Sequence, residues 1–173
     1  MTSSRIAPWA LLAVRVFMGA FFLYEAANQL AKGWIGGDGL RKMITSALRD
    51  NSIPGPYRSF LENVVIENDR IFTLLVIPGE IAVGLALVLG IATRFSALVA
   101  LSMNVNFAIM NGVVTAGGLF DVLFVVLEVA LIAFVARQAL SVDGVLARRG
   151  VVVPLLTGIP WNREGTSPQR RSP

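Results

Sequence analysis

The sequence contains no cysteine and no histidine, and only 15% of its 173 residues are charged. Without cysteine or histidine, the chain cannot form disulfides, thiol redox relays, zinc sites, iron–sulfur clusters or histidine-ligated haem, and we expect no metal site. Any redox chemistry therefore requires a bound organic cofactor or a partner subunit. With 55% hydrophobic residues and a mean hydropathy of +0.69, the composition is typical of an integral membrane protein.

The positive charge does not indicate a nucleic-acid partner. The net charge is +4 and the pI is near 10.3, but the cations occur in loops and near the C-terminal end, as membrane topology signals do. We therefore expect the lipid bilayer, rather than a nucleic acid, to surround this chain.

Four apolar runs reach the length of roughly 20 residues that is needed to cross a bilayer. They predict an all-α, integral membrane four-helix bundle within residues 1–138. The predicted spans lie at about residues 8–31, 70–91, 95–113 and 118–138. Residues 139–162, interrupted by Pro154 and Pro160, are expected to lie along the cytoplasmic surface, and residues 163–173 are expected to be disordered.

The distribution of arginine predicts the orientation of the bundle. Arg94 lies in the turn between the second and third spans, whereas the turn NGVVTAGG between the third and fourth spans has no cation. Arginines also follow the last span, at Arg137, Arg148, Arg149, Arg163, Arg170 and Arg171. Since positive residues favour the cytoplasmic side, both termini are expected to be cytoplasmic and the loop 32–69 to lie outside.

The outer loop contains two amphipathic patterns separated by the sequence PGP. Apolar residues recur at helical spacing at Leu40, Met43, Ile44, Ala47 and Leu48, and again at Tyr57, Phe60, Leu61, Val64 and Val65. These patterns predict two short helices lying flat over the outer end of the bundle. They could act as interfacial anchors or as a lid over a ligand entrance.

Polar side chains occur inside every predicted span. With a helix rise of about 1.5 Å per residue, Arg15, Glu80, Asn104 and Glu128 are expected at similar depth. Arg15 is expected to meet Glu80 and Glu128, while Asn104 adds hydrogen bonds. A second layer is expected to line the approach from the outer side, formed by Glu25, Gln29, Asn111 and Asp121.

The expected cluster has two interpretations. Two carboxylates beside one guanidinium leave a surplus negative charge, so the pair is expected to keep a proton that it can exchange. Glu80 and Glu128 are then candidate catalytic residues, and the other polar side chains are candidate ligand-binding residues. Alternatively, Arg15 and the two carboxylates form an ionic cluster that only fixes the register of the helices.

Several of these segments resemble a known family. RVFMGAFFLYEAANQL in the first span, PGEIAVGLALVLGIATR at the end of the second, and the four-span layout with its long first loop resemble the DoxX family. That family is related to the DoxD small subunit of thiosulfate:quinone oxidoreductase. The resemblance covers roughly residues 10–140. It implies a bacterial or archaeal inner-membrane protein, linked in some members to quinone reduction and in others to complexes that handle oxidative stress or sulfur compounds.

Two functions remain open at this point. The first is a quinone-interacting membrane subunit of an oxidoreductase, in which Arg15 orients a quinone oxygen and Glu80 or Glu128 passes protons. Such a subunit has no intrinsic cofactor and is not catalytic alone, so it requires a soluble or membrane redox partner. The second is a non-enzymatic scaffold, or a carrier of a small solute or proton. The sequence does not indicate an oligomeric state.

Overall fold

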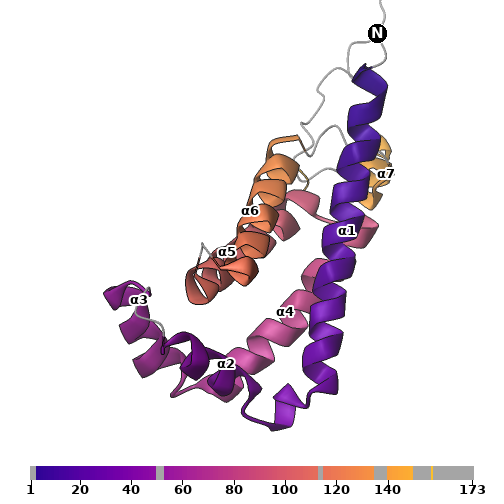
Figure 1. Cartoon of the computed structure of the whole chain (residues 1–173). Coiled ribbons are helices and arrows are strands. Elements are labelled where there is room, and N and C mark those ends of the chain that lie inside the picture. The colour runs from indigo at the N-terminus through magenta and orange to yellow at the C-terminus, as the bar shows by residue number, and fades with distance from the viewer. Residues whose placement is uncertain (1–2, 50–52, 113–114, 135–139, 150–156, 158–173) are drawn as a thin grey trace, which may run out of the picture.

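The computed structural model describes residues 3–49, 53–112, 115–134, 140–149 and 157, and within them the chain is all-helical. The long helices are α1 (Ser3–Ala31), α4 (Asp69–Leu89), α5 (Thr93–Asn111) and α6 (Ala116–Phe134) (Figure 1). The shorter elements are the 3₁₀ turn η1 (Trp34–Gly36), α2 (Gly39–Ala47), α3 (Gly55–Phe60), the π-helical η2 (Leu61–Val65) and α7 (Val142–Arg148). Most of the expected surface segment 139–162, and the whole expected tail 163–173, lie outside the described residues.

Three helices in the described part of the chain are long and apolar enough to cross a membrane: Pro8–Ala31 within α1, α4 and α6. Large apolar side chains cover their outer faces, and Leu75 and Val126 are 63% and 59% exposed. Because a helix satisfies its backbone hydrogen bonds internally, such apolar surfaces are suited to lipid, and the chain is a membrane protein. The fourth expected span overlaps α5, which is not among these three helices, so its crossing of the membrane stays a prediction.

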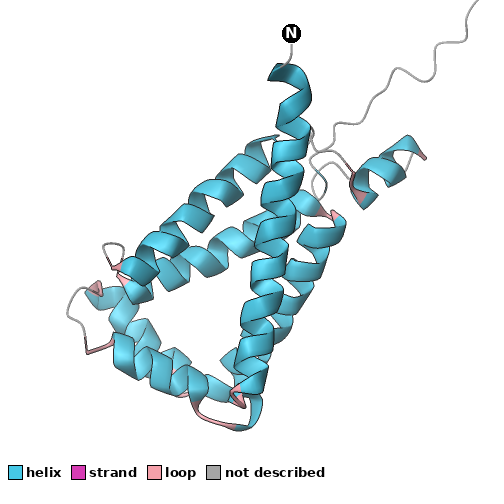
Figure 2. Cartoon of the chain, turned by 45° about the vertical axis from the view of Figure 1, so that its right-hand side comes forward, coloured by secondary structure: helices cyan, strands magenta, loops and turns pink. Residues whose placement is uncertain are grey.

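The long helices form two antiparallel pairs. Helix α1 packs along α4, and α5 packs along α6, with fewer contacts between the pairs. The pairs come together near α7 and diverge toward the other end, where α2 and α3 bridge the opening (Figures 1 and 2). This V shape leaves the inner faces of the helices directed toward one another at the wide end.

Two glycines set the register of the first pair. A Cβ atom added to Gly19 of α1 would lie 2.7 Å from the carbonyl oxygen of Gly84, and one added to Gly84 would lie 2.9 Å from that of Gly19. The backbones therefore approach as closely as small residues permit. Because the helices are antiparallel, residues before Gly19 face the C-terminal end of α4 and residues after it face Glu80.

The apolar interior has two parts. One cluster joins the long helices: Met18, Phe22, Val83, Leu87, Ala97, Ala100, Phe124 and Leu131. The other lies beneath the short helices of the loop: Leu40, Ile44, Ile53, Leu61, Val65 and Met110. The loop segment is thus held on the wide end of the V by burial of its own apolar face, as well as by the chain connections.

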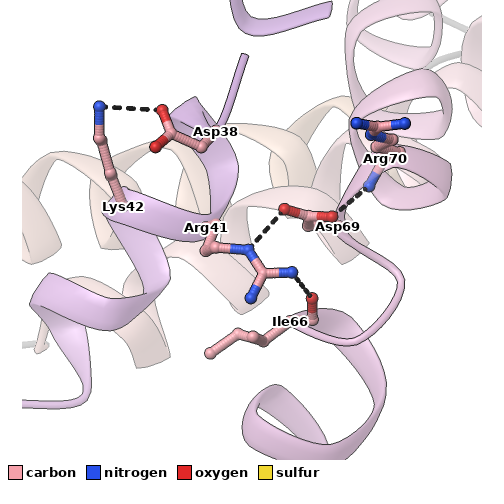
Figure 3. Close-up of polar contacts among 6 residues, drawn as sticks. All are labelled: Asp38, Arg41, Lys42, Ile66, Asp69 and Arg70. Atoms are coloured by element: carbon pink, nitrogen blue, oxygen red, sulfur yellow. Dashed lines mark hydrogen bonds and ion pairs between the residues drawn. The ribbon is translucent and has the colours of Figure 1, made fainter. Parts of the chain in front are cut away.

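Polar contacts fasten α2 to the start of α4 (Figure 3). Arg41 donates from Nε to Asp69 Oδ2 at 2.8 Å and from Nη2 to the carbonyl oxygen of Ile66 at 2.7 Å. The hydrogen bond to the Asp69 carboxylate raises the pKa of Arg41 above its usual value. Since the Arg41 side chain is 45% exposed, solvent screens this ion pair and weakens its contribution to stability.

Candidate functional site

Polar side chains from all four long helices converge on one cavity of about 450 Å³ at the wide end of the V. Six of the side chains that the sequence analysis predicted for the site line this cavity: Glu25, Gln29, Glu80, Asn104, Asn111 and Asp121. Glu128 is fully buried beside the cavity, where it is bonded to Asn104. The structure therefore brings both expected layers together, with the exception of Arg15.

Three carboxyl groups in this region, those of Glu80, Glu128 and Asp121, each accept a hydrogen bond from an amide side chain of the neighbouring helix. Gln29 donates from Nε2 to Glu80 Oε1 at 3.0 Å, which joins α1 to α4. Asn104 donates from Nδ2 to Glu128 Oε1 at 2.5 Å, and Asn111 donates to Asp121 Oδ2 at 2.8 Å, which joins α5 to α6. These pairs satisfy one oxygen of each carboxyl group without a cation.

The remaining oxygens of the two most deeply buried carboxyl groups have no hydrogen-bond partner among the described residues. These atoms are Glu80 Oε2 and Glu128 Oε2. The amide oxygen of Gln29, Oε1, is also buried and has no hydrogen-bond partner among the described residues. Only 2% of Glu80 and none of Glu128 is exposed. Leaving a buried polar atom unpaired costs about 1–3 kcal/mol, so such atoms commonly mark a place for a ligand, a water molecule or a transferred proton.

Aromatic rings form much of the remaining wall of the cavity. Phe21, Phe22, Trp34, Phe107 and Phe120 all contribute to it. Apolar and aromatic walls with a few polar groups are typical of sites for organic ligands. Flat rings beside hydrogen-bonding groups are suited to a planar molecule that carries polar oxygens.

The cavity does not have the donors of a metal centre. No group of three or more carboxylate, histidine or cysteine side chains close enough to hold a metal ion occurs among the described residues. The hydrogen bonds from Gln29 and Asn104 leave one oxygen of Glu80 and one of Glu128 without a hydrogen-bond partner among the described residues. The polar groups that line the cavity can form hydrogen bonds, and its carboxyl groups can transfer protons.

Arg15 does not meet Glu80 and Glu128 as the sequence analysis expected. It is 1% exposed and donates from Nη2 to the carbonyl oxygen of Leu140 at 2.7 Å, beside Gly90 at the end of α4. At about 1.5 Å per residue, that end lies roughly 15 Å along α4 from Glu80. The Gly19–Gly84 contact sets this register, so residues before Gly19 face the turn that follows α4.

The charge of Asp143 in α7, a residue that no sequence pattern singled out, acts on this arginine. Its carboxylate accepts hydrogen bonds from the backbone N–H of Ala92 and of Thr93, each at 2.8 Å, and from the Thr93 hydroxyl at 2.9 Å. It therefore caps the N-terminus of α5 from a distant part of the chain. Ser141 caps α7 itself and is the one local signal in the sequence, but it does not reveal which helix Asp143 contacts.

We expect Asp143→Asn to destabilise the protein by about 1–2 kcal/mol, because an amide offers one acceptor oxygen to three donors. The measurement is thermal unfolding in nanodiscs. The matched control is Asp38→Asn, since Asp38 pairs with Lys42 at the surface and is 58% exposed there. Equal melting temperatures for the two variants would show that the cap contributes nothing.

Long apolar helices around a cavity with buried carboxyl groups define a helical membrane protein with a polar interior site. The chain belongs to the family described as TQO small subunit DoxD, whose family model matches residues 11–160. This match confirms the resemblance to the related DoxX and DoxD proteins that the sequence indicated. Comparisons with curated proteins and with solved structures give no match.

Proposed function

We propose that the chain is a quinone-interacting membrane subunit of an oxidoreductase of the thiosulfate:quinone type. The observation that carries this proposal is the polar cavity, which is lined by Glu80 and by five aromatic side chains. One buried oxygen of Glu80 has no hydrogen-bond partner among the described residues. A quinone head group is a flat ring with two carbonyl oxygens, so it fits between the rings and accepts hydrogen bonds. The description of the family as a small subunit supports a place in a larger complex.

The reaction divides between this chain and a partner. Reduction of a quinone to a quinol takes up two electrons and two protons. Glu80 and Glu128 are placed to donate protons to the quinone oxygens, and a positioned acid of this kind contributes about 10²–10⁴-fold to the rate. Because the sequence has no cysteine or histidine to hold a redox centre, the electrons come from a soluble or membrane redox partner.

Protons return to the two buried acids through the outer layer of the cavity. Asp121 and Glu25 line the same cavity and are less buried than Glu80. They connect the interior acids to the side of the cavity that lies toward the loop helices. In this proposal Asn104 and Gln29 hold the acids in position, and Arg15 is not part of the quinone site.

The membrane arrangement that accompanies this function has four crossings. We propose that α1, α4, α5 and α6 all span the inner membrane, with both termini cytoplasmic. Helix α5 then crosses with Asn104 and Asn111 turned toward α6, where each donates a hydrogen bond to a carboxyl group. Helices α2 and α3 lie along the outer surface over the wide end of the bundle.

Blocking the cavity tests the function directly. Gly117 lines the cavity near the start of α6, and an added Cβ would meet only Asn111, at 3.8 Å, so a larger side chain can enter. We expect Gly117→Phe to weaken binding of a menaquinone or ubiquinone analogue by about tenfold or more, equivalent to about 1.4 kcal/mol. Quenching of the fluorescence of Trp34, which lines the same cavity, reports binding in nanodiscs.

The control is Leu119→Phe, on the same helix but 58% exposed and outside the cavity. It should bind the quinone as the parent does. Unchanged affinity in Gly117→Phe would place quinone binding elsewhere. Absence of saturable binding by the parent would favour the alternative, a non-enzymatic scaffold or a carrier of a small solute or proton.

A further inference from the structure

A second cavity, of about 320 Å³, lies between the loop helices on one side and helices α4 and α5 on the other. Its walls are almost wholly apolar, and none of its lining residues is charged. Apolar side chains of α2, η2, α4 and α5 form much of its wall: Leu40, Ile44, Leu61, Val65, Val76 and Met110. Such a lining excludes a charged or strongly polar ligand.

The few polar side chains on this second cavity are already engaged within the protein. Tyr57 donates from its hydroxyl to Asn106 Oδ1 at 2.8 Å, and Asn106 donates to the Ser102 carbonyl oxygen at 2.6 Å. The Ser102 hydroxyl donates to the carbonyl oxygen of Val99 at 2.7 Å. In contrast with the polar cavity, none of the residues described as lining this one has a buried side-chain nitrogen or oxygen without a hydrogen-bond partner. The apolar cavity therefore offers no such atom to bind a polar head group. The space is therefore suited to a hydrocarbon chain.

The two cavities are neighbours. Phe107 of α5 lines both of them, and on α2 the adjacent residues Met43 and Ile44 line the polar and the apolar cavity respectively. The boundary between the cavities therefore includes one aromatic side chain and one short helix. A molecule with a polar ring and an apolar tail matches this arrangement of one polar and one apolar space.

We infer that the apolar cavity binds the isoprenoid tail of the quinone whose head group occupies the polar cavity. This inference rests on the proposed function and specifies its substrate as a tailed, membrane-soluble quinone. A phospholipid acyl chain has the same hydrocarbon chemistry, but its phosphate would enter a polar cavity that is lined by three acidic side chains and by a single cation, Lys32. Burial of tail surface contributes about 25 cal/mol per Å², so the tail adds substantially to affinity.

The test compares a ubiquinone analogue that carries an isoprenoid tail with the tail-less head group, by calorimetric titration of the protein in nanodiscs. Val76 lines the apolar cavity but not the polar one, so Val76→Trp fills the tail space. We expect this variant to weaken binding of the tailed quinone by about tenfold and to leave the tail-less quinone unchanged. The matched control is Val126→Trp, at a position that is 59% exposed on α6.

Each outcome decides a separate point. Equal effects of Val76→Trp on both quinones, or an effect on neither, would overturn the tail assignment while leaving quinone binding intact. Failure of the parent to bind either quinone would overturn the proposed function, and the inference with it. If Val76→Trp does not fold, photolabelling of the parent with a tailed quinone carrying a diazirine at the tail end gives the answer. Labels on the apolar cavity support the inference, and labels confined to lipid-facing residues such as Val126 contradict it.

Discussion

Replacing Glu80 or Glu128 with glutamine should leave the protein folded while quinone reduction falls by about 100-fold or more, the usual contribution of a positioned acid. Glutamine matches glutamate in size and retains an oxygen that can accept from Gln29 or Asn104. What it loses is the ability to exchange a proton at the oxygen that has no hydrogen-bond partner among the described residues. Binding of the quinone should therefore change much less than turnover.

Reduction of a ubiquinone or menaquinone analogue with thiosulfate as donor, in membranes that contain the partner, is the measurement. Thermal unfolding of the purified variants verifies the fold. Glu67→Gln is the control, since this glutamate is exposed in the loop before α4 and should retain full activity. Parental turnover in both glutamine variants, with the fold intact, would remove the two acids from the mechanism and leave them a structural role.

The Gly19→Ala variant should lose about 2–3 kcal/mol of stability, because one methyl group is forced into a contact made by backbone atoms. The added carbon would lie 2.7 Å from the carbonyl oxygen of Gly84 and 2.9 Å from the backbone nitrogen of Val88. Neither atom can turn away as a flexible side chain could. Helices α1 and α4 must therefore separate, and the Gln29–Glu80 hydrogen bond should weaken with them.

The same substitution at Gly79 provides a control, since an added Cβ meets nothing within 4 Å there. Gly79→Ala removes a flexible residue from the interior of α4 and should raise stability by up to about 1 kcal/mol. Thermal unfolding in nanodiscs compares the two variants with the parent. Equal melting temperatures for Gly19→Ala and the parent would contradict the close approach of the two helices.

Residue chemistry was sufficient to predict that the polar side chains of the outer layer would lie close together. Ionisable and amide groups inside apolar helices must face one another, because lipid cannot satisfy them. For this reason the predicted outer layer of Glu25, Gln29, Asn111 and Asp121 lines a single cavity in the structure. The helical character of the chain followed in the same way from its long apolar runs.

The position of Arg15 could not be predicted from the same reasoning. A depth counted from the ends of a hydrophobic run depends on where the helix enters the membrane, and α1 begins at Ser3, before the expected span. The contact between Gly19 and Gly84 sets the relative height of α1 and α4, and small residues occur at many other positions in both helices. The sequence does not reveal that contact. Charge alone therefore predicts that an arginine and two carboxylates in different helices form ion pairs.

The role of Asp143 depends on tertiary structure alone. It lies about fifty residues after the donors that it caps, in a segment that local patterns identify only as a short helix. The left-handed backbone conformation of Ala92, with φ of 45°, directs the N–H groups of the turn toward that carboxylate. No periodicity within residues 90–95 indicates which part of the chain supplies the cap.

This distant cap imposes an order on biogenesis. The α4–α5 hairpin is synthesised before α6, yet the hydrogen-bond acceptor for Ala92 and Thr93 arrives only when residue 143 has left the ribosome. Until then, the hairpin turn must rely on water or lipid head groups. Docking of α7 is therefore a late step in maturation, and a chain that has not yet been extended to Asp143 cannot complete this end of its bundle.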